Sequence, residues 1–407
     1  MSKRVLYVSY DGMTDPLGQS QVIPYLAGLS QSGNEITIVS AEKKKNLQQH
    51  GNDIQQLLSE NNIQWYPVIY SNKIPGVSAF LTYRRLLGKS LQLHQQGAFG
   101  LIHCRSYIPS LIGLFFKRKH GVKFIFDMRG FWADERVEGG IWNIANPFYK
   151  SAYRYFKKKE KEFLTASDAV VSLTESGKQE ILSWKDIKLS PQKITVIPCC
   201  ADLDLFSSKN ISAVTQQRLR SALGIGEKNF VLCYTGSTGT WYLLEEMLRF
   251  FKCLLAYRAD AIMLIISADD VALIRSAVER EQIDQSKIRV RCGSRTEMPA
   301  LISICQASVF FIRNTYSKKA SSPTKMGELM SMGIPIVCNG GIGDIEAIME
   351  HSHAGILMES LTNENYILAI NKLLATTFSA EEIRNAASLH FSLPVGVSRY
   401  QHIYQSV

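Results

Sequence analysis

Two segments of this chain share one pattern, in which an apolar strand runs directly into a polar loop that contains glycine, and the loop runs into a helix. In the first segment, residues 5–10 form the strand and residues 11–18 the loop. In the second segment, the strand is 230–234 and the loop 235–239. Strands followed at once by helices predict parallel sheets covered by helices on both faces. Because 407 residues are too many for one compact core, each segment is expected to open its own α/β domain.

Further apolar runs fit the same alternation. The predicted strands are 35–39, 100–103, 123–127, 169–173, 194–197, 262–266, 288–291 and 309–312, and residues 108–116 predict a short buried helix. In doubly wound sheets ligands bind beyond the carboxyl ends of the strands, so polar residues that follow these runs are the first candidates for a site. Neither half has a complete G-x-G-x-x-G sequence, which disfavours an enzyme that uses a nicotinamide cofactor.

The stretch 321–338 predicts a polar loop, a helix, a Gly-Pro break and a strand. Ser322 can cap the helix and Pro323 suits its first turn, so unpaired backbone N–H groups and Lys325 would lie together and favour a diphosphate. Glu328 lies one turn further on, where a charged acceptor favours a diol such as a ribose. Together these residues predict a nucleotide-sugar site. The alternative is an ordinary capped amphipathic helix that leads into a buried strand.

This stretch resembles the donor-site helix of the GT-B glycosyltransferases, family 4 of the bacterial polysaccharide type in particular. In that family a Glu precedes a small-residue turn and a G-x-P-[IV]-[IV] strand. Residues 197–206 are similar to the family's I-P-N-G-V-D-x-x-x-F hinge, with Cys199 and Cys200 in place of Asn-Gly. Residues 393–404 are similar to its closing helix, which returns to the first domain.

The resemblance implies an α/β GT-B fold, in which two Rossmann-like doubly wound domains face each other across a cleft. Residues 1–204, completed by a C-terminal helix 388–407, would form the acceptor-side domain. Residues 205–387 would form the nucleotide-sugar donor domain.

Two features of the family pattern are missing. Ala320 stands where the first Glu of the E-x7-E pair is expected. Ser237 and the pair 241–242 lie where the loop after the second glycine run usually carries an Arg and a Lys. Lys325 is therefore the leading phosphate cation, with Arg313, Lys318 and Lys319 as possible helpers.

The donor site is expected to draw on both glycine loops and on the helix after 321. The predicted donor and diphosphate contacts are Gly18, Gly236, Ser237, Thr238, Ser322, Thr324, Lys325, Glu328, Gly341 and Gly343, and the resemblance places the base near Ser294 and Arg295. Each glycine loop could equally be plain strand-to-helix geometry, and 340–344 a plain turn into the next helix. Uracil is the commonest base in the family, so a UDP-sugar is expected.

The first-domain loop 127–135 combines acidic, basic and aromatic residues directly after a buried strand. Family members often place a catalytic or sugar-contacting residue in this loop, and Arg129 is its nearest equivalent. The predicted catalytic residues are Arg129, Lys325 and Glu328, and the predicted acceptor contacts are Asp15, Arg105, Asp134 and Glu135. A structural network of salt bridges is the competing interpretation of this loop.

The formal net charge of +10 lies almost wholly in the first half, because residues 1–185 carry 24 Lys and Arg against 15 Asp and Glu. The excess gathers at 117–119 and 154–161, which favours an anionic membrane surface as partner. No nucleic-acid-binding motif accompanies the charge, so nucleic acid is not expected. A solvated charged helix face is the alternative.

No apolar run approaches the ~20 residues that cross a bilayer, and the sequence enters a strand without a signal-peptide pattern. We therefore expect a cytoplasmic protein, peripheral at the inner face of the membrane. The eight cysteines include no C-x-x-C pair and the eight histidines form no convincing ligand set, which predicts free thiols and no metal. No cofactor is expected besides the nucleotide-sugar substrate.

Taken with the resemblance, these features predict a glycosyltransferase, EC class 2.4. It would move a sugar from a nucleotide diphosphate sugar to a glycan or lipid-linked acceptor, with retention of anomeric configuration, in the synthesis of cell-surface polysaccharide or glycoconjugate. One alternative is a nucleotide-sugar 2-epimerase on the same fold, which would need no acceptor. The other is a non-catalytic, nucleotide-sugar-binding partner of another transferase, which the missing carboxylate at Ala320 keeps open.

Overall fold

The structure is a computed structural model in which residues 3–71 and 76–407 are described. The chain divides into two compact units. The first consists of Met1–Cys199, Lys319–Ser321 and Leu393–Val407, and the second of Cys200–Lys318 and Ser322–Ser392.

The division lies a few residues from the expected boundaries at 204 and 388. Residues 200–204 join the second unit, where Ala201 pairs with Ser392 and its N–H donates to the carbonyl of Phe391 at 2.8 Å. The closing helix begins at Leu393 and belongs to the first unit.

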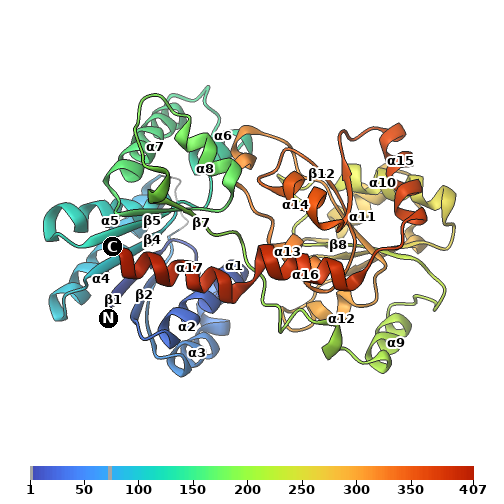
Figure 1. Ribbon diagram of the computed structural model, residues 1–407, viewed down its shortest axis with the longest axis horizontal. Helices are drawn as coiled ribbons and strands as arrows, with labels where there is room; N and C mark the ends of the chain where they lie inside the picture. Colours follow the sequence, from blue (N-terminus) through green and yellow to red (C-terminus); the bar gives the residue numbers. More distant parts are fainter. Residues whose placement is uncertain (1–2, 72–75) are drawn as a thin grey trace. The chain divides into compact units, whose positions relative to one another are not determined.

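A parallel sheet of seven strands forms the middle of the first unit. Its strands are β1 (Arg4–Ser9), β2 (Glu35–Glu42), β3 (Ile63–Ile69), β4 (Leu101–Arg105), β5 (Lys123–Asp127), β6 (Ala169–Ser172) and β7 (Ile194–Val196). They lie in the order β3-β2-β1-β4-β5-β6-β7, so the winding reverses between β1 and β4 (Figure 1). The central strands are apolar and buried, as parallel strands between two layers of helices must be.

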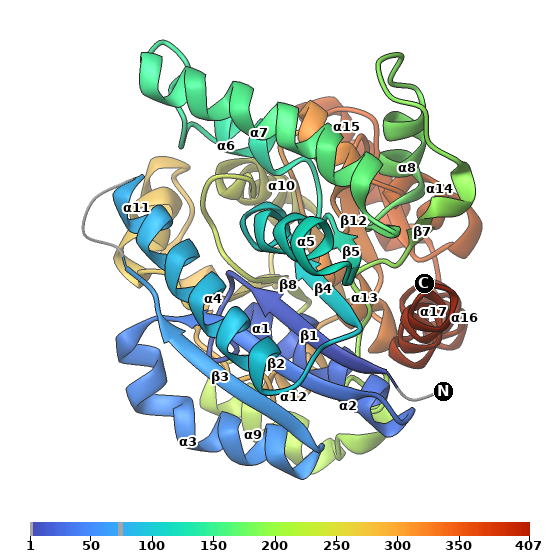
Figure 2. The same ribbon diagram turned by 90° about the vertical axis from the view of Figure 1, so that its left-hand side faces the viewer.

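Helices cover both faces of this sheet. They are α1 (Pro16–Gln21), α2 (Ile23–Gln31), α3 (Lys44–Glu60), α4 (Val77–Gln96), α5 (Tyr107–His120), α6 (Trp132–Glu138), α7 (Pro147–Ala166), α8 (Glu175–Leu182) and the closing helix α17 (Leu393–Ser406). Figure 2 shows α4, α5 and α7 over one face and α2 and α3 over the other, where α17 packs against α2.

The second unit contains a parallel sheet of six strands. Its strands are β8 (Val231–Thr235), β9 (Ile262–Ile266), β10 (Ile288–Arg291), β11 (Ala307–Phe310), β12 (Ile336–Asn339) and β13 (Gly355–Met358). The order β10-β9-β8-β11-β12-β13 repeats the winding of the first unit, with the reversal between β8 and β11. The expected doubly wound α/β fold is therefore confirmed for both units.

The helices of the second unit alternate with its strands. They are α9 (Ala213–Ala222), α10 (Leu244–Tyr257), α11 (Val271–Arg280), α12 (Met298–Ile302), α13 (Thr324–Ser331), α14 (Ile345–Ser352), α15 (Asn363–Ala375) and α16 (Ala380–Phe391). Short 3-10 turns lie at Pro191–Lys193, Ser208–Asn210, Gln285–Lys287 and Tyr316–Ala320.

Two strands were not predicted from the sequence. β3 is the edge strand of its sheet, is half exposed and contains Pro67, which only an edge strand tolerates well. β13 is short and opens at Gly355, whose φ of 147° brings its backbone so close to β12 that a Cβ would lie 1.9 Å from the carbonyl oxygen of Ile336.

The helix expected after the first glycine loop is two helices. Val22 lies between α1 and α2 in a non-helical conformation, because Pro24 has no N–H with which to continue the hydrogen bonds of α1. Gly18 lies inside α1 rather than at its opening, which corrects the prediction. A Cβ on Gly18 would lie 2.1 Å from the carbonyl oxygen of Gly12, so this glycine serves a close contact between α1 and the loop before it.

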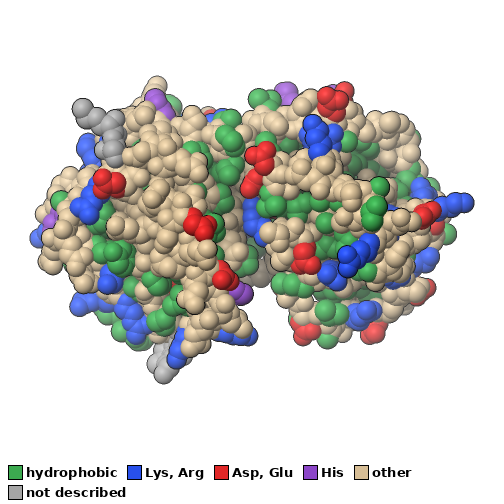
Figure 3. All heavy atoms as spheres, turned by 90° about the horizontal axis from the view of Figure 1, so that it is seen from below, with side chains coloured by type: hydrophobic (Ala, Val, Ile, Leu, Met, Phe, Trp, Pro, Cys, Tyr) green, Lys and Arg blue, Asp and Glu red, His purple; other side chains and the backbone are tan. Residues whose placement is uncertain are grey.

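On the face drawn in Figure 3, acidic and basic side chains are interspersed with hydrophobic ones. Among the described residues, no helix is both long and apolar enough to cross a membrane.

Gly113 of α5 offers a test of how this helix packs on the sheet. A Cβ at this position would lie 2.3 Å from the ring of Phe124 and 2.8 Å from the sulfur of Cys104. We expect Gly113→Ala to lower the free energy of unfolding by about 1–3 kcal/mol, the usual effect of overpacking a core. Denaturant unfolding measures it.

The matched control is Gly88→Ala in α4, where a Cβ would meet nothing within 4 Å. This variant should gain about 0.5–1 kcal/mol, since alanine favours a helix over glycine. Equal stability of the two variants would contradict the packing of α5.

Candidate functional site

The winding of the second sheet reverses between β8 and β11, and a doubly wound sheet binds its ligand beyond the carboxyl ends of such strands. β8 runs directly into the glycine loop 236–239, and the chain after β11 leads to α13. The predicted donor residues of the second unit therefore come together at one edge of its sheet.

Lys325 is buried at this edge among aromatic side chains. Its Nζ donates to the hydroxyl of Tyr234 at 3.0 Å and lies 3.5 Å from the ring centroid of Tyr242. The faces of aromatic rings attract a cation. Gly236 has a φ of 111°, and a Cβ on it would lie 3.0 Å from Lys325 Nζ. The ammonium group is thus held directly against the glycine loop.

Lys325 and Glu328 lie one turn apart on α13, and burial shifts the pKa of both. Burial lowers the pKa of Lys325 well below its ordinary value, and Glu328 opposes this shift. Burial raises the pKa of Glu328, and Arg295 opposes that shift, since its Nη1 donates to Glu328 Oε1 at 3.2 Å. The residues predicted to bind the ribose and the base are therefore in contact with each other.

The glycine loop is only partly open. Ser237 is exposed, and its carbonyl accepts a hydrogen bond from Tyr234. The N–H and the hydroxyl of Thr238 both donate to Asp269 Oδ2, the hydroxyl at 2.8 Å. In this conformation a carboxylate occupies the Thr238 donors that were predicted to meet the diphosphate.

Helix α13 begins one residue later than predicted. Pro323, and not Ser322, is its N-cap, in an extended conformation with a ψ of 113° and without a side-chain capping hydrogen bond. The prediction that Ser322 caps α13 is therefore wrong. Thr324 and Lys325 are the first helical residues, and their N–H groups lie at the positive end of the helix dipole.

Three predicted donor or base contacts have their backbone N–H groups engaged inside the second unit. Gly341 donates to Glu346 Oε1 at 3.2 Å, and Gly343 to the carbonyl of Lys318 at 2.8 Å. Ser294 donates to a carboxylate oxygen of Glu297 at 2.9 Å. These bonds favour the plain-turn interpretation of 340–344.

The helper cations differ in their surroundings. Lys318 is buried, with its Nζ 3.6 Å from the ring centroid of Trp241. Arg313 is exposed. Lys319 groups with the first unit and forms an ion pair of 2.8 Å with Glu180. Two lysines of the second unit thus rest on the aromatic pair 241–242, which stands where the family carries its Arg and Lys.

In the first unit the winding reverses between β1 and β4, and buried charges lie at the carboxyl ends of β4 and β5. Arg105 ends β4, donates from Nε to Asp11 at 3.2 Å, and lies 4.0 Å from Asp127 Oδ2. Nη1 of Arg129 lies 3.9 Å from Asp127 Oδ1, and its Nη2 is 3.3 Å from the sulfur of Cys199. The two predicted arginines therefore flank one buried carboxylate.

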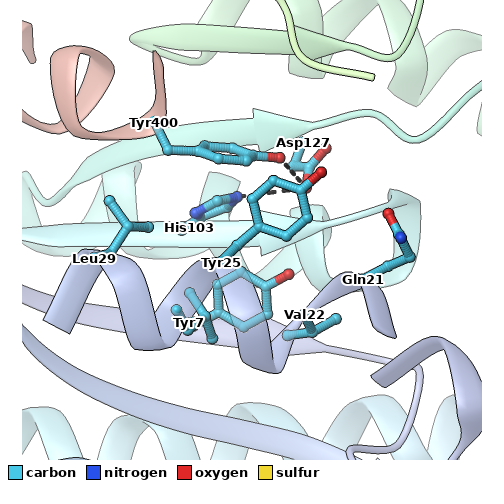
Figure 4. Close-up of a pocket in the computed structure, with 9 residues that line it drawn as sticks. Tyr7, Gln21, Val22, Tyr25, Leu29, His103, Asp127 and Tyr400 are labelled. Atoms are coloured by element: carbon cyan, nitrogen blue, oxygen red, sulfur yellow. Dashed lines mark hydrogen bonds and ion pairs between the residues drawn. The ribbon is translucent and has the colours of Figure 1, made fainter. Parts of the chain in front are cut away.

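Asp127 is 1% exposed, and Figure 4 shows the side chains of Tyr400 and His103 beside it. Tyr400 of α17 donates to Asp127 Oδ2 at 3.1 Å, and His103 Nε2 lies 3.6 Å from the same oxygen. Burial alone would raise the pKa of Asp127, but Arg129 and His103 bring it below its ordinary value. Burial lowers the pKa of His103. Asp127 is therefore the charged member of the pair and His103 the neutral one.

Two residues at this edge adopt positive φ although they are not glycine. They are Ser106 after β4, with a φ of 68°, and Arg129 after β5, with a φ of 58°. Such conformations cost on the order of 1–3 kcal/mol and cluster at functional sites. The N–H of Ser106 donates to the carbonyl of Asp127 at 2.7 Å, which ties the two strand ends together. This strain supports the choice of Arg129 as a functional residue.

The predicted acceptor residues lie on separate elements of the first unit. Asp134 is buried in α6 and accepts from Tyr153 and Lys157, both at 2.8 Å, so the structural-network interpretation fits this residue. Asp15 precedes α1 and accepts from a lysine and an asparagine at the start of α3. Glu135 lies beside Asp134 in the first turn of α6.

Sequence reasoning missed Glu42, the last residue of β2. Its buried carboxylate accepts from the N–H of Met13 at 2.7 Å, from the hydroxyl of Thr14 at 2.6 Å and from the hydroxyl of Ser40. Glu42 therefore fixes the first glycine loop. Its place at the end of a strand was the signal that could have revealed it.

Among the described residues, no group of His, Cys, Asp and Glu side chains could hold a metal ion. None of the eight cysteines, all of which the structure describes, forms a disulfide. Cys292 is exposed just beyond the end of β10.

Residues 18–205, just under half of the chain, match the family model for Glycosyltransferase Family 4. HepE of Anabaena, solved with UDP and glucose, is 13% identical over 100% of both chains, with a TM-score of 0.70. A glycosyltransferase of Rickettsia africae is 16% identical over 99% of this chain and 98% of its own, with a TM-score of 0.71. A Listeria monocytogenes protein described as a UDP-N-acetylglucosamine 2-epimerase is 12% identical over 100% and 98%, with a TM-score of 0.60. No curated protein sequence matched the chain.

Two doubly wound parallel sheets and these structural likenesses define the GT-B fold. The family match likens residues 18–205 to Glycosyltransferase Family 4, and the solved structures are similar to the whole chain in fold.

Replacing Lys325 by methionine should stabilise the protein. Burial disfavours the charged lysine, so at pH 7 the folded state carries a cost that a neutral side chain of similar length avoids. We expect Lys325→Met to raise the free energy of unfolding by about 1–4 kcal/mol, as when buried charges give way to apolar side chains.

The gain should depend on pH. A lysine whose pKa is lower in the folded state binds fewer protons there than in the unfolded chain, so the wild type gains stability as pH rises toward 10.5. The difference between wild type and Lys325→Met should therefore shrink over that range in denaturant unfolding. The exposed Lys45→Met serves as control. A difference that stays constant with pH would contradict a depressed Lys325 pKa.

Proposed function

We propose that the protein transfers a sugar from a nucleotide diphosphate sugar, with UDP as the nucleotide, to a glycan or lipid-linked acceptor. The observation that carries the proposal is the pair of buried Lys325 and partly buried Glu328, one turn apart on α13 beside the reversal point of the second sheet. A cation at a helix N-terminus suits a diphosphate, and a carboxylate one turn further on suits ribose hydroxyls. The UDP bound to HepE supports the choice of nucleotide.

Breaking the bond between sugar and diphosphate leaves negative charge on the diphosphate, and groups that stabilise this charge lower the barrier. Lys325 supplies a full charge, and the first N–H groups of α13 supply partial ones. Because burial disfavours protonated Lys325, an anionic diphosphate and the lysine proton favour each other's binding. Lys325 is then most strongly charged when the donor is present.

Glu328 needs a partner in both states of the site. Without nucleotide it accepts from Arg295, whose guanidinium also lies over the ring of Phe206 at 5.5 Å. On donor binding, Glu328 would exchange or share this partner with the ribose hydroxyls. The Arg295 guanidinium would then remain over the Phe206 ring, and the N–H groups that Glu328 releases could donate hydrogen bonds to the base.

The acceptor side of the reaction is assigned to the first unit. Arg129 and Arg105 are held by Asp127 at the carboxyl ends of β5 and β4. Asp15 and Glu135 are the proposed contacts to acceptor hydroxyls. Asp134 is less suited to this role, since both of its carboxylate oxygens already accept hydrogen bonds.

We also propose that the anomeric configuration is retained. Ala320 removes the carboxylate that the family places near the donor sugar, and Glu328 is engaged by Arg295. A same-face substitution, in which a phosphate oxygen of the donor takes the acceptor proton, needs no protein nucleophile. NMR of the product should show the donor's anomer, and an inverted anomer would reject this mechanism.

The proposed reaction belongs to the synthesis of cell-surface polysaccharide or glycoconjugate at the inner face of the membrane, and it needs no divalent metal. Helix N–H groups and Lys325 supply the charge stabilisation that a metal would otherwise give. Turnover should therefore persist in the presence of a chelator, and its abolition would count against this part of the proposal.

The two alternative functions predict different results when the products are analysed. An epimerase would invert a ring carbon of the donor sugar without any acceptor, and the solved epimerase superposes less closely than the transferase does. A non-catalytic binding partner would bind the nucleotide sugar and release no UDP with a full panel of acceptors. Product analysis with and without acceptor separates the three functions.

Glu328→Ala should weaken UDP binding about tenfold to a hundredfold, because a hydrogen bond to a charged group contributes roughly 1.5–3 kcal/mol. Titration calorimetry measures the affinity, with GDP, ADP and CDP as competing nucleotides. Glu364→Ala, at the exposed start of α15, is the matched control and should bind UDP like the wild type. Unchanged UDP affinity in both Glu328→Ala and Lys325→Ala would rule out this donor site.

A further inference from the structure

The basic residues that the sequence offered for membrane contact are mostly neutralised. The ion pairs are Lys117 with Asp168, Arg118 and Lys159 with Glu162, Lys157 with Asp134, and Lys161 with Asp186. Within the described part of the chain, Arg154 and Lys158 form no ion pair and point outward on α7. The site of any contact with an anionic surface therefore has to be sought where unpaired cations remain.

The outer face of α7 carries such cations. Lys150, Arg154 and Lys158 are exposed and follow one another at intervals of four residues, so they lie in one row along the helix. Phe148 and Tyr155 lie beside this row on the helix surface and are also exposed, Phe148 to 57%. Residues 139–158 contain no Asp or Glu.

The loop before α7 adds two apolar side chains. Ile141 and Ile144 are each about half exposed, at 52% and 48%. Between them Trp142 packs against the rings of Trp132, at 5.2 Å, and Phe156, at 6.0 Å. The tryptophan anchors the loop, so its neighbours project outward from a fixed base.

Helix α4 lies next to this segment. A Cβ on Gly76, the N-cap of α4, would lie 2.8 Å from the ring of Phe148. Burial raises the pKa of Tyr83 in α4, and the nearby Tyr155 of α7 adds to this rise. Figure 2 shows the N-terminal ends of α4 and α7 at the same end of the unit. Phe80 is 58% exposed there, with Val77 and Leu81 beside it. The whole of α4 contains no Asp or Glu.

We propose that this α4–α7 surface, made of the first two turns of α4, the loop 139–146 and residues 147–158 of α7, docks on an anionic lipid bilayer. Contiguous exposed apolar side chains mark an interaction site, whereas single ones do not. Apolar side chains enter the boundary between headgroups and acyl chains, while lysines and arginines bind the anionic headgroups. A surface with cations and without acidic residues is complementary to the negatively charged surface of such a bilayer.

The position of the surface fits an acceptor that comes from the membrane. α4 follows the carboxyl end of β3, and the segment from α6 to α7 follows the carboxyl end of β5, where Arg129 lies. A bilayer under these segments would deliver a lipid-linked acceptor to the edge of the sheet that carries the proposed acceptor residues. This last step rests on the proposed function, whereas the bilayer contact does not.

Vesicle co-sedimentation of the full chain tests the contact. The protein should bind vesicles of phosphatidylcholine mixed with phosphatidylglycerol, bind vesicles of phosphatidylcholine alone far less, and lose binding as salt rises. Lys150→Gln with Arg154→Gln and Lys158→Gln should weaken binding roughly a hundredfold, since each cation near such a surface contributes about fivefold. Phe80→Ser with Phe148→Ser should also weaken vesicle binding, because it removes two apolar side chains that would enter the bilayer.

Matched controls lie elsewhere on the chain. Lys44→Gln with Lys45→Gln and Lys119→Gln removes three exposed charges from the first unit, and Leu273→Ser removes an exposed apolar side chain from α11. Both should bind vesicles nearly as the wild type does. Thermal unfolding should be unchanged in every variant, because the substituted side chains are exposed.

Equal binding of the protein to both kinds of vesicle would overturn the proposal, and so would equal losses of binding in the triple variant and its triple control. A third contrary result would be that the protein binds no vesicles but self-associates, and that Phe80→Ser with Phe148→Ser abolishes the self-association. The last result would make the surface an interface between copies of the chain. UDP affinity, measured on the same variants without vesicles, should stay at the wild-type value. Failure of the wild type to bind UDP would reject the donor site and leave the vesicle result standing.

Discussion

The burial of parallel strands between two layers of helices is the constraint on which both units depend. A parallel strand needs a crossover before its neighbour can form, so all strands of a sheet end at the same edge. The reversals between β1 and β4 and between β8 and β11 open that edge to a ligand. Arg105 is the last residue of β4, Arg129 follows β5 by two residues, and the glycine loop 236–239 follows β8 directly. Helix α13 starts in the connection after β11. Topology thus fixes where chemistry can occur, and side chains decide which chemistry it is.

The two units accommodate buried charge in different ways. In the first, the buried charge of Asp127 is balanced by the nearby guanidinium groups of Arg105 and Arg129, and Tyr400 donates a hydrogen bond to it. In the second, Lys325 rests on aromatic rings and makes its hydrogen bond to a neutral hydroxyl. A cation held by ring faces and a neutral hydroxyl gains more from an incoming anion than one in direct contact with a carboxylate. The second unit is therefore the one suited to bind a diphosphate, and the first is suited to hold residues in place.

Local sequence signals were enough for the fold class and for part of the site. Glycine loops and apolar runs located most strands, and the helix pattern located Lys325, because these signals lie within a few residues of one another. The Asp127 cluster could not be foreseen, since Tyr400 reaches it from a helix 273 positions away. The same holds for Asp269, which binds Thr238 across 31 positions. Charge counting gave the sign of the first unit's surface, but ion pairing decided which cations remain exposed.

The aromatic pair 241–242 changes what donor binding requires. An Arg and a Lys in this loop would add charge near Lys325 and lower its pKa further by repulsion. Rings instead hold Lys318 and Lys325 without repelling them, so the site needs fewer neutralising contacts while it is empty. In the proposed donor complex, the diphosphate would meet fewer cations and depend more on N–H groups, among them that of Thr238, which donates to Asp269 in this structure. Donor binding in this chain should therefore be coupled to release of the Asp269 carboxylate from the glycine loop, because the two anions compete for the same donors.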